Sequence, residues 1–474
     1  MIFSWLVITI VSTRFLPIAV FGKYILYNIS ITLLTTLSQS FITNTLLRLY
    51  PQYKQTNKLD DFVSNMFYYL LISTTVTIIL ILLAYCLVPN LLNKILPFNI
   101  IYLIIPLIIL NIYNFFLSIY RATGNVILYG FFNFWQMIGS FGIGFLVYTY
   151  NNQEATDFYL GFIGALLLFA PFIYFQFKLI INKLFDYKLS DHFKHDLLSY
   201  GFPIFIIGTS SLLLSNLDKY FIIYLLDINK VSLYSAIYTI SEQSILPITG
   251  LLSITSIPYL FNQFEKSGAD HAKVFQEKIL KFYLFLSLPA LIILCIFSNE
   301  ILSLVLTNKY QKAFILLPYI SVGAFFIGLS NVFSEAFTLR KKTSTLMYLY
   351  LASIIFNAIL NYLLINKFGI LGAAIATFSS YALLFILIFN FSRKLIKFNL
   401  LREEIFALLI SVILLASFCF IIKNTISIES IFNLIFYIIT SLLIYFSSIA
   451  AFKYYDYQMV YISISKIYKK IIIT

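Results

Sequence analysis

Long apolar segments separated by short polar ones run along the whole chain. Thirteen are long enough to cross the about 30 Å hydrocarbon core of a bilayer as helices of roughly 20 residues. They lie at about 22–47, 62–88, 100–120, 126–149, 158–181, 202–226, 231–260, 279–298, 313–338, 345–365, 370–391, 403–422 and 430–452. Met1 to Thr13 would reach only about 20 Å as a helix, so it either continues to Val20 despite Pro17 or belongs to a longer first helix. Including it, we predict an all-α, polytopic membrane protein of about 14 transmembrane helices.

The segments between the apolar runs carry most of the positive charge. Counted from an inside N-terminus, the even-numbered loops and the C-terminal tail hold about 23 of the 32 Lys and Arg residues, and the odd-numbered loops about 8. The positive-inside rule therefore places both termini in the cytoplasm. Heavy use of Ile, Phe, Asn, Lys and Tyr is typical of an AT-rich bacterial genome, so we expect the inner (plasma) membrane of a bacterium. The longest loops, Asn182 to Gly201 and Phe261 to Lys278, are too short for a soluble domain.

Composition excludes a soluble protein. The chain is 61% hydrophobic and 11% charged, with a mean hydropathy of +0.93, against about 45–50% and about 25% in soluble domains. The net charge of +13 flanks apolar runs, which favours anionic lipid headgroups and excludes nucleic acid as the expected partner. Cys86, Cys295 and Cys419 lie within apolar runs without metal-ligand spacing, so we interpret them as buried or lipid-phase thiols.

Three charged residues interrupt apolar runs and are the most informative side chains in the chain. Asp218 and Lys219 lie within the run that ends at Leu226, and Glu242 lies within the next run. A charge at the bilayer centre costs about 2.5–3.5 kcal/mol on insertion scales, so it usually faces a cavity or a partner. The three residues could form a structural ion pair, or they could form a site where a substrate phosphate competes for Lys219.

Several further charges lie near predicted helix ends. Arg14 lies near the outer end of the first helix, while Arg48, Arg121 and Arg340 lie at inner ends, with Glu335 one turn inside Arg340. Interfacial anchoring explains inner-end arginines without any function, although Arg121, Glu335 and Arg340 could also form a cytoplasmic gate. Arg48 follows a hydrophilic helix that we predict to line a water-filled lumen. Its polar residues are Thr35, Thr36, Ser38, Gln39, Ser40, Thr43, Asn44 and Thr45.

No catalytic or metal-binding pattern is visible in the sequence. His192 and His195 have a loosely metal-like spacing but no further ligands nearby, so no metal is expected. Glycine-rich phosphate loops, nucleophile elbows and paired catalytic carboxylates are absent from the sequence. We therefore expect neither a cofactor nor catalytic residues, and the chain is predicted not to be an enzyme.

Weak internal symmetry suggests a repeat. Arg121 and Arg340 follow the fourth and tenth predicted helices at an offset of about 219 residues. Parallel repeats of this kind surround midplane cavities in transporters. We predict a six-helix lobe at 1–181, a cytoplasmic linker at 182–201, a second six-helix lobe at 202–391, and two additional helices with a cytoplasmic tail at 392–474.

Four segments resemble one family in order along the chain. They are Phe21-Gly22-Lys23-Tyr24 leading to Leu47-Arg48-Leu49-Tyr50-Pro51, Arg121-Ala122-Thr123-Gly124-Asn125, Asn216-Leu217-Asp218-Lys219 leading to Tyr234-Ser235, and Phe368-Gly369-Ile370-Leu371-Gly372-Ala373-Ala374-Ile375-Ala376-Thr377. The chain thereby resembles the Wzx-type polysaccharide flippases of the multidrug/oligosaccharidyl-lipid/polysaccharide (MOP) exporter superfamily. It departs from that family at its start, which lacks part of the first helix and leaves the position of Arg14 and the completeness of the N-terminus open.

The resemblance implies a MATE-like fold of two pseudo-symmetric six-helix lobes around a cationic lumen. The cargo would be an undecaprenyl-pyrophosphate-linked oligosaccharide for O-antigen of lipopolysaccharide or for a capsule, flipped by alternating access and coupled to H⁺ or Na⁺. Arg14, Arg48 and Lys219 would attract the cargo's pyrophosphate or acidic sugars, while Asp218 and Glu242 would balance that charge or bind the coupling ion. A polysaccharide polymerase and a chain-length regulator would be its protein partners.

Two other classes remain open at this stage. The first is a transporter of the same architecture, either a cation-coupled drug exporter or a flippase for a peptidoglycan or teichoic-acid precursor. A drug exporter should have acidic cavity residues without a basic lumen, whereas the charged residues that we expect to line the cavity here are more often basic than acidic. The second is a polytopic polysaccharide polymerase or glycosyltransferase, which generally needs a sizeable extracytoplasmic loop that the sequence does not provide.

Overall fold

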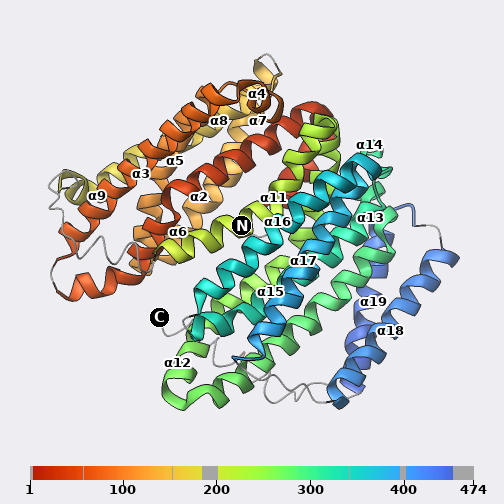
Figure 1. The fold of residues 1–474 in the computed structure, drawn as a ribbon. Helices are drawn as coiled ribbons and strands as arrows, with labels where there is room; N and C mark the ends of the chain where they lie inside the picture. Colours follow the sequence, from red (N-terminus) through yellow and green to blue (C-terminus); the bar gives the residue numbers. More distant parts are fainter. Residues whose placement is uncertain are drawn as a thin grey trace. The chain divides into compact units, whose positions relative to one another are not determined.

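The computed structural model describes residues 4–56, 58–151, 153–183, 201–340, 342–395, 402–426 and 428–451, and within them it consists of helices and short connections, without strands (Figure 1). Eleven helices in these ranges are long and apolar enough to cross a membrane. The other predicted crossings correspond to the short apolar helix α1 (Ser4–Phe15), to α11 (Phe202–Leu225) and to the first part of α12 (Ile228–Ile296). The all-helical, multi-pass membrane fold is therefore confirmed.

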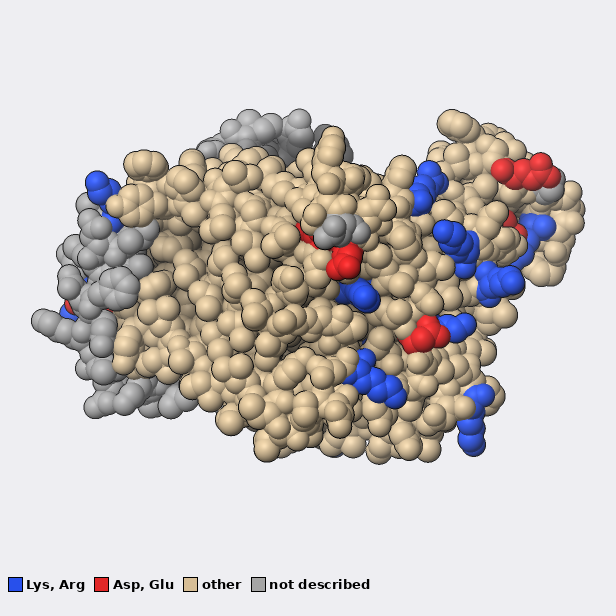
Figure 2. Space-filling model, turned by 90° about the horizontal axis from the view of Figure 1, so that it is seen from above, with Lys and Arg blue, Asp and Glu red and all other residues tan. Residues whose placement is uncertain are grey.

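The chain divides into two compact units. Unit 1 consists of Met1–Gln243 and Lys341–Leu387, and unit 2 of Ser244–Arg340 and Ile388–Thr474. The predicted lobe boundaries remain a prediction. Figure 2 shows one face of the molecule, on which a broad area without Lys, Arg, Asp or Glu lies beside a region where these charged residues are more numerous.

Unit 1 begins with a helix break at Pro17. The proline has φ −57° and ψ 145° and separates α1 from α2 (Ile18–Gln55), because its ring and its missing N–H prevent α1 from continuing. The first predicted segment therefore ends at Phe15 instead of extending to Val20. The next helices of unit 1 are α3 (Leu59–Leu87), α4 (Pro89–Ile95), α5 (Ile101–Ala122), α6 (Val126–Phe134), a π-helical turn (Trp135–Gly139) and α7 (Ser140–Tyr150).

The remaining helices of unit 1 include one predicted crossing that is divided. The segment predicted at 158–181 forms α8 (Thr156–Leu167) and α9 (Ala170–Lys183), which are separated by a turn at Leu168 and Phe169. Unit 1 is completed by α11, the start of α12, α16 (Thr343–Phe368) and most of α17 (Ile370–Ser392). Of the predicted linker 182–201, residues 184–200, with His192 and His195, lie outside the described residues.

Unit 2 holds the rest of α12, then α13 (Ser298–Val305), α14 (Asn308–Gln311), α15 (Leu316–Leu339), α18 (Arg402–Thr425) and α19 (Ile431–Ala451). Buried polar side chains fix its helices to one another. Gln276 of α12 donates to the carbonyl of Val332 at 3.0 Å, and Tyr445 of α19 donates to the carbonyl of Phe285 at 3.1 Å. Lys423 of α18 donates to the carbonyl of Ile296, where α12 ends, at 2.5 Å.

The prediction of a loop from Phe261 to Lys278 was wrong, because this stretch is helical and belongs to the 69 residues of α12. A straight helix of that length would be about 100 Å long, more than three times the hydrocarbon thickness. The ribbon of α12 accordingly changes direction near the bottom of Figure 1. Ala, Lys, Glu and Gln, which are good helix formers, make up half of this stretch and favour its helical conformation.

Close helix contacts in unit 1 depend on glycine. A Cβ atom at Gly161 of α8 would overlap the backbone of Gly144 on α7, whereas one at Gly164 would lie 3.9 Å from Ile143, an ordinary contact. Lipid tails are as apolar as the helices, so the hydrophobic effect does not drive membrane helices together. Their association relies instead on small residues that permit close packing. The α7–α8 pair therefore requires glycine at position 161 but not at position 164.

We expect Gly161→Ala to destabilise the protein by about 1–3 kcal/mol, because the added methyl group overpacks the contact. Gly164→Ala is the matched control on the same helix and should be neutral or stabilising, since alanine favours helix by about 1 kcal/mol where space allows. Thermal unfolding of both purified variants in detergent measures the difference. Equal melting temperatures would show that α7 and α8 do not approach as closely as described.

Candidate functional site

The sequence-predicted charges Asp218 and Lys219 lie in the interior of α11 and are almost completely shielded. Asp218 is 0% exposed and Lys219 is 4% exposed. Both belong to unit 1, as do all the residues that contact them in the following description. Burial of two opposite charges is tolerated only when their polar atoms are hydrogen-bonded.

Three donors satisfy the carboxylate of Asp218. The backbone N–H of Lys219 donates to Oδ1 at 2.8 Å, and the hydroxyl groups of Tyr234 and Thr377 donate to Oδ2 at 2.5 and 3.2 Å. Tyr234 belongs to α12 and Thr377 to α17, so the carboxylate joins three helices. Hydrogen bonds to an ionised acceptor are roughly twice as strong as those between neutral groups, so Asp218 is a strong link in unit 1.

Neutral acceptors of its own helix hold the ammonium group of Lys219. Nζ donates to the carbonyl of Ser215 at 2.9 Å and to Oδ1 of Asn216 at 3.1 Å. It lies 3.7 Å from Oδ1 of Asp218, which is within ion-pair distance but too long for a hydrogen bond. The same nitrogen lies 3.8 Å from the centre of the Tyr238 ring, a cation–π contact.

Glu242 joins the same cluster through Tyr238. The Tyr238 hydroxyl donates to Oε1 of Glu242 at 3.2 Å and lies 2.9 Å from the hydroxyl of Tyr381 on α17. The half-buried carboxylate also experiences the charges of Lys219 and Asp218. The structure thus brings together Asp218, Lys219 and Glu242, which the sequence had only placed in neighbouring runs.

Four partners of these charges were not predicted, namely Tyr234, Tyr238, Thr377 and Tyr381. A usable signal existed on α12, where Tyr234, Tyr238 and Glu242 are spaced four residues apart and therefore lie on one helix face. Thr377 and Tyr381 have the same spacing on α17, but no local pattern connects them with Asp218 across 159 residues of chain.

Local sequence explains how α17 reaches the cluster. Gly369 has φ +59°, a conformation that glycine adopts readily, and ends α16. A Cβ atom at Gly372 would overlap the carbonyl of Leu364, so only glycine lets α17 begin this close to α16. The small side chains of Ala373, Ala374 and Ala376 are completely buried. This stretch brings Thr377 within hydrogen-bonding distance of Asp218.

The predicted lumen-lining face of α2 is only partly consistent with the structure. Thr35, Ser38 and Thr45 are buried, and their hydroxyls donate to carbonyls one turn earlier in α2. Ser38 also bonds Asn111 of α5, which donates to Thr74 of α3 at 2.9 Å. These three side chains therefore belong to helix packing within unit 1 instead of lining a lumen, because back-bonded hydroxyl groups are inexpensive to bury.

The remaining predicted site residues belong to other helices than α11, α12 and α17, or to their ends. Arg14 and Arg48 are exposed, at the end of α1 and in the second half of α2. Arg121 is exposed at the end of α5, with its guanidinium 6.0 Å from the Tyr129 ring. Arg340 follows α15 in unit 2, 5.3 Å from the Phe264 ring. Their proposed roles in a translocation path or gate remain predictions.

Glu335 is a second buried carboxylate, in α15 of unit 2. It is 8% exposed, and Ser253 of α12 provides a hydrogen bond. It lies one helical turn before Arg340. Arg121 belongs to unit 1, whereas Glu335 and Arg340 belong to unit 2. The predicted gate residues are therefore described separately for each unit.

Within the described ranges, no group of three or more His, Cys, Asp or Glu side chains is arranged to hold a metal ion. The cysteines are unpaired: Cys419 is buried, Cys295 is partly buried and Cys86 is exposed. Cys86 lies on the apolar span α3, where an exposed side chain would face lipid. The three cysteines are therefore consistent with buried or lipid-phase thiols.

Comparison with known families gives two matches. The sequence profile described as polysaccharide biosynthesis protein matches residues 4–264, which is more than half of the chain, and the MatE profile matches residues 203–363. Both matched ranges include Asp218, Lys219, Tyr234 and Glu242.

Two curated relatives come from Methanocaldococcus jannaschii. The uncharacterized membrane protein MJ1068 is 25% identical over 265 residues, covering 54% of this chain and 52% of the relative. The uncharacterized membrane protein MJ1375 is 25% identical over 238 residues, covering 46% of this chain and 55% of the relative. The matched part of the chain thus spans about half the length of these curated relatives.

Solved structures share the fold over most of the chain. A lipid II flippase MurJ in an inward closed conformation has a TM-score of 0.68 at 17% identity, covering 94% of this chain and 96% of its own. An inward-facing multidrug resistance MATE family transporter has a TM-score of 0.63 at 15% identity, covering 83% and 94%. A MOP superfamily transporter from Pyrococcus furiosus has a TM-score of 0.59 at 15% identity, covering 82% and 91%. The chain therefore belongs to the polysaccharide biosynthesis protein family and has the fold of MOP superfamily membrane transporters.

Proposed function

We propose that this chain is a flippase for undecaprenyl-pyrophosphate-linked oligosaccharides. It would move repeat units of O-antigen or capsular polysaccharide from the cytoplasmic to the outer leaflet of a bacterial inner membrane by alternating access. Membership of the polysaccharide biosynthesis protein family supports a saccharide cargo. The likeness in fold to a lipid II flippase supports a cargo attached to a lipid.

The observation that carries the proposal is the bonding of Lys219. Its two hydrogen-bond acceptors, the Ser215 carbonyl and the Asn216 amide oxygen, are both neutral. Asp218 lies 3.7 Å away and accepts its hydrogen bonds from the backbone N–H of Lys219 and from the hydroxyls of Tyr234 and Thr377, not from the ammonium group. A phosphate oxygen carries charge and forms shorter, stronger hydrogen bonds with an ammonium group than a neutral oxygen does. Lys219 is thus arranged so that an anionic cargo improves its bonding.

The two carboxylates of the cluster are the proposed binding groups for a coupling ion. Asp218 lies 3.7 Å from the ammonium group of Lys219, and Glu242 is linked to the same group through Tyr238. Binding of H⁺ or Na⁺ to either carboxylate would leave the positive charge of Lys219 less balanced and would strengthen its attraction for phosphate. Coupling between ion and cargo would then be a local electrostatic effect. Arg14 and Arg48 are proposed to attract the cargo along its path.

Reconstituted protein provides the test. Proteoliposomes receive a fluorescently labelled undecaprenyl-pyrophosphate oligosaccharide, and its crossing is followed by an impermeant quencher. Crossing with the intact protein supports the flippase, and slower crossing with Arg48→Ala at equal folded yield supports a cationic path. Efflux of drugs or cations without crossing of any glycan tested would favour the exporter, to which the MatE match and the MATE-like fold also correspond.

We expect Lys219→Ala to slow translocation by about tenfold or more, because a hydrogen bond to a charged group contributes about 1.5–3 kcal/mol. Lys219→Arg keeps the charge and should retain more activity than alanine. Lys367→Ala, at an exposed lysine of α16 in the same unit, is the control and should match the intact protein. A Lys219→Ala protein that is folded and equally fast would exclude Lys219 from the path.

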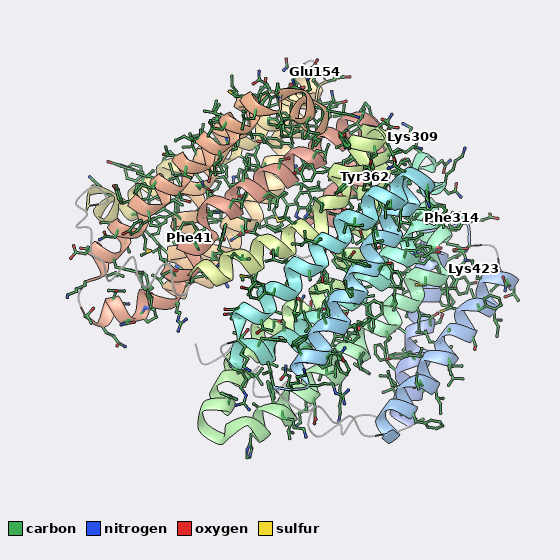
Figure 3. All side chains as sticks on the ribbon, in the orientation of Figure 1. Phe41, Glu154, Lys309, Phe314, Tyr362 and Lys423 are labelled. Atoms are coloured by element: carbon green, nitrogen blue, oxygen red, sulfur yellow. The ribbon has the colours of Figure 1, made fainter. Side chains whose placement is uncertain are left out.

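Tyr238 offers a separate test of how Lys219 is positioned. Tyr238→Phe keeps the ring over Nζ but removes the bonds to Glu242 and Tyr381, whereas Tyr238→Leu also removes the ring. A cation–π contact contributes about 0.5–2 kcal/mol, so the leucine variant should be about 2- to 30-fold slower than the phenylalanine variant. The same pair at Tyr362, an exposed tyrosine of α16 labelled in Figure 3, is the control. Equal rates for Tyr238→Phe and Tyr238→Leu would remove any positioning role for the ring.

A further inference from the structure

A cavity of about 260 Å³ lies at the end of unit 1 that the charge distribution predicts to be outside. Three segments form it: the start of α2, the connection from α4 to α5, and the connection from α7 to α8 with the first turns of α8. Glu154, labelled in Figure 3, belongs to the last of these segments. No part of the Asp218 cluster lines this cavity.

One wall of the cavity is aromatic and fixed. Phe98, which is partly exposed, faces it, and the completely buried Tyr159 supports Phe98, with ring centres 5.7 Å apart in an edge-to-face contact. Behind them, Tyr27 stacks on Tyr159 with ring centres 4.0 Å apart and also contacts Phe98 at 5.9 Å. Aromatic side chains packed on one another in this way form a rigid apolar surface.

The other walls offer polar groups of both charges. Lys23 of α2 supplies an ammonium group, Glu154 a carboxylate, and Gln153 an amide. The hydroxyl of Thr156 lies 3.4 Å from Oε2 of Glu154. The cavity therefore presents hydrogen-bond donors and acceptors together, with opposite charges that balance.

Asp157 fixes the loop that carries these groups. This buried carboxylate accepts from the backbone N–H of Glu154 at 3.0 Å and from the side chain of Asn151 at 2.6 Å. Gln153 adopts φ +59° within the loop, which is uncommon for a residue other than glycine. The polar wall is thus held in a defined conformation beside the aromatic wall.

We infer that this cavity is a binding site for a single sugar ring. A pyranose has an apolar face of C–H groups that can lie on the partly exposed ring of Phe98, and hydroxyl groups that both donate and accept hydrogen bonds. A phosphate would meet the carboxylate of Glu154, and a cation would meet the ammonium of Lys23. A purely apolar ligand would bury these charges without partners, which is costly.

The size of the cavity supports the same ligand. At about 260 Å³ it is slightly smaller than the roughly 300–1,000 Å³ of sites for drug-sized ligands, so it suits one ring and not a whole oligosaccharide. A neighbouring cavity of about 580 Å³ shares Pro97 and Phe98 with it and adds Tyr85, Asn93 and Asn99 as polar lining. A saccharide chain can therefore continue from one cavity into the next. The identification of the bound sugar as part of the transported cargo rests on the proposed function. The binding site itself adds to that function a place where the cargo would be recognised.

Binding of free sugars to the full chain in lipid nanodiscs tests the site. The probes are neutral hexoses and N-acetylhexosamines, titrated by saturation-transfer NMR. We expect at least one probe to bind and its affinity to fall about tenfold or more in Glu154→Gln, which loses a hydrogen bond to a charged group, and to fall in Phe98→Leu. The controls are Glu429→Gln, at an exposed carboxylate between α18 and α19, and Phe175→Leu, at an exposed ring of α9. Both controls should bind as the intact protein does.

Three outcomes would overturn the site: no binding of any probe, equal losses in the control variants, or a loss in Lys219→Ala without a loss in Glu154→Gln. The last would place the sugar at the Asp218 cluster. Since this measurement needs no translocation, it separates the two proposals. Failure to bind free sugar leaves the flippase standing, whereas sugar binding without any translocation contradicts the flippase and keeps the site.

Discussion

The structure of unit 1 depends on how a buried carboxylate and a buried ammonium group are kept inside membrane-spanning helices. Removing one member of such a pair typically costs about 3–5 kcal/mol, because the other charge is left without compensation. Asp218 meets this constraint with donors from α11, α12 and α17. Lys219 meets it with acceptors of its own helix and the ring of Tyr238. The positions of three helices are thereby tied to one charge cluster.

The two charges are satisfied in different ways, and that difference connects structure with transport. The bonds of Asp218 reach other helices and stabilise the unit, whereas the bonds of Lys219 are local and neutral. Lys219 can exchange its acceptors for an anion while Asp218 keeps α11, α12 and α17 together. Elsewhere in unit 1, helices approach through Gly144, Gly161 and Gly372 and through hydroxyls bonded to their own helix. Such contacts satisfy polar groups without adding charge.

The sequence alone was sufficient for the fold class and for the embedded charges, because long apolar runs and a charge within one of them are strong local signals. It was insufficient where one sequence pattern is compatible with two different structures. The polar stretch from Phe261 to Lys278 suits a loop as well as an exposed helix, and the structure makes it part of α12. Thr35 and Ser38 suit a lumen as well as a helix contact. Thr377 could not be connected with Asp218, since the contact spans 159 residues.

The central claim is that the charge of Asp218 offsets the attraction of the nearby Lys219 for an anionic cargo, and the affinity of the chain for undecaprenyl pyrophosphate tests it most directly. Native mass spectrometry in nanodiscs would compare the intact protein with Asp218→Asn, which keeps the shape of the side chain but removes its charge. If the charge of Asp218 offsets this attraction, the variant binds this lipid several-fold more tightly, while binding of uncharged undecaprenol stays the same. Equal or weaker binding of undecaprenyl pyrophosphate by folded Asp218→Asn would contradict the account.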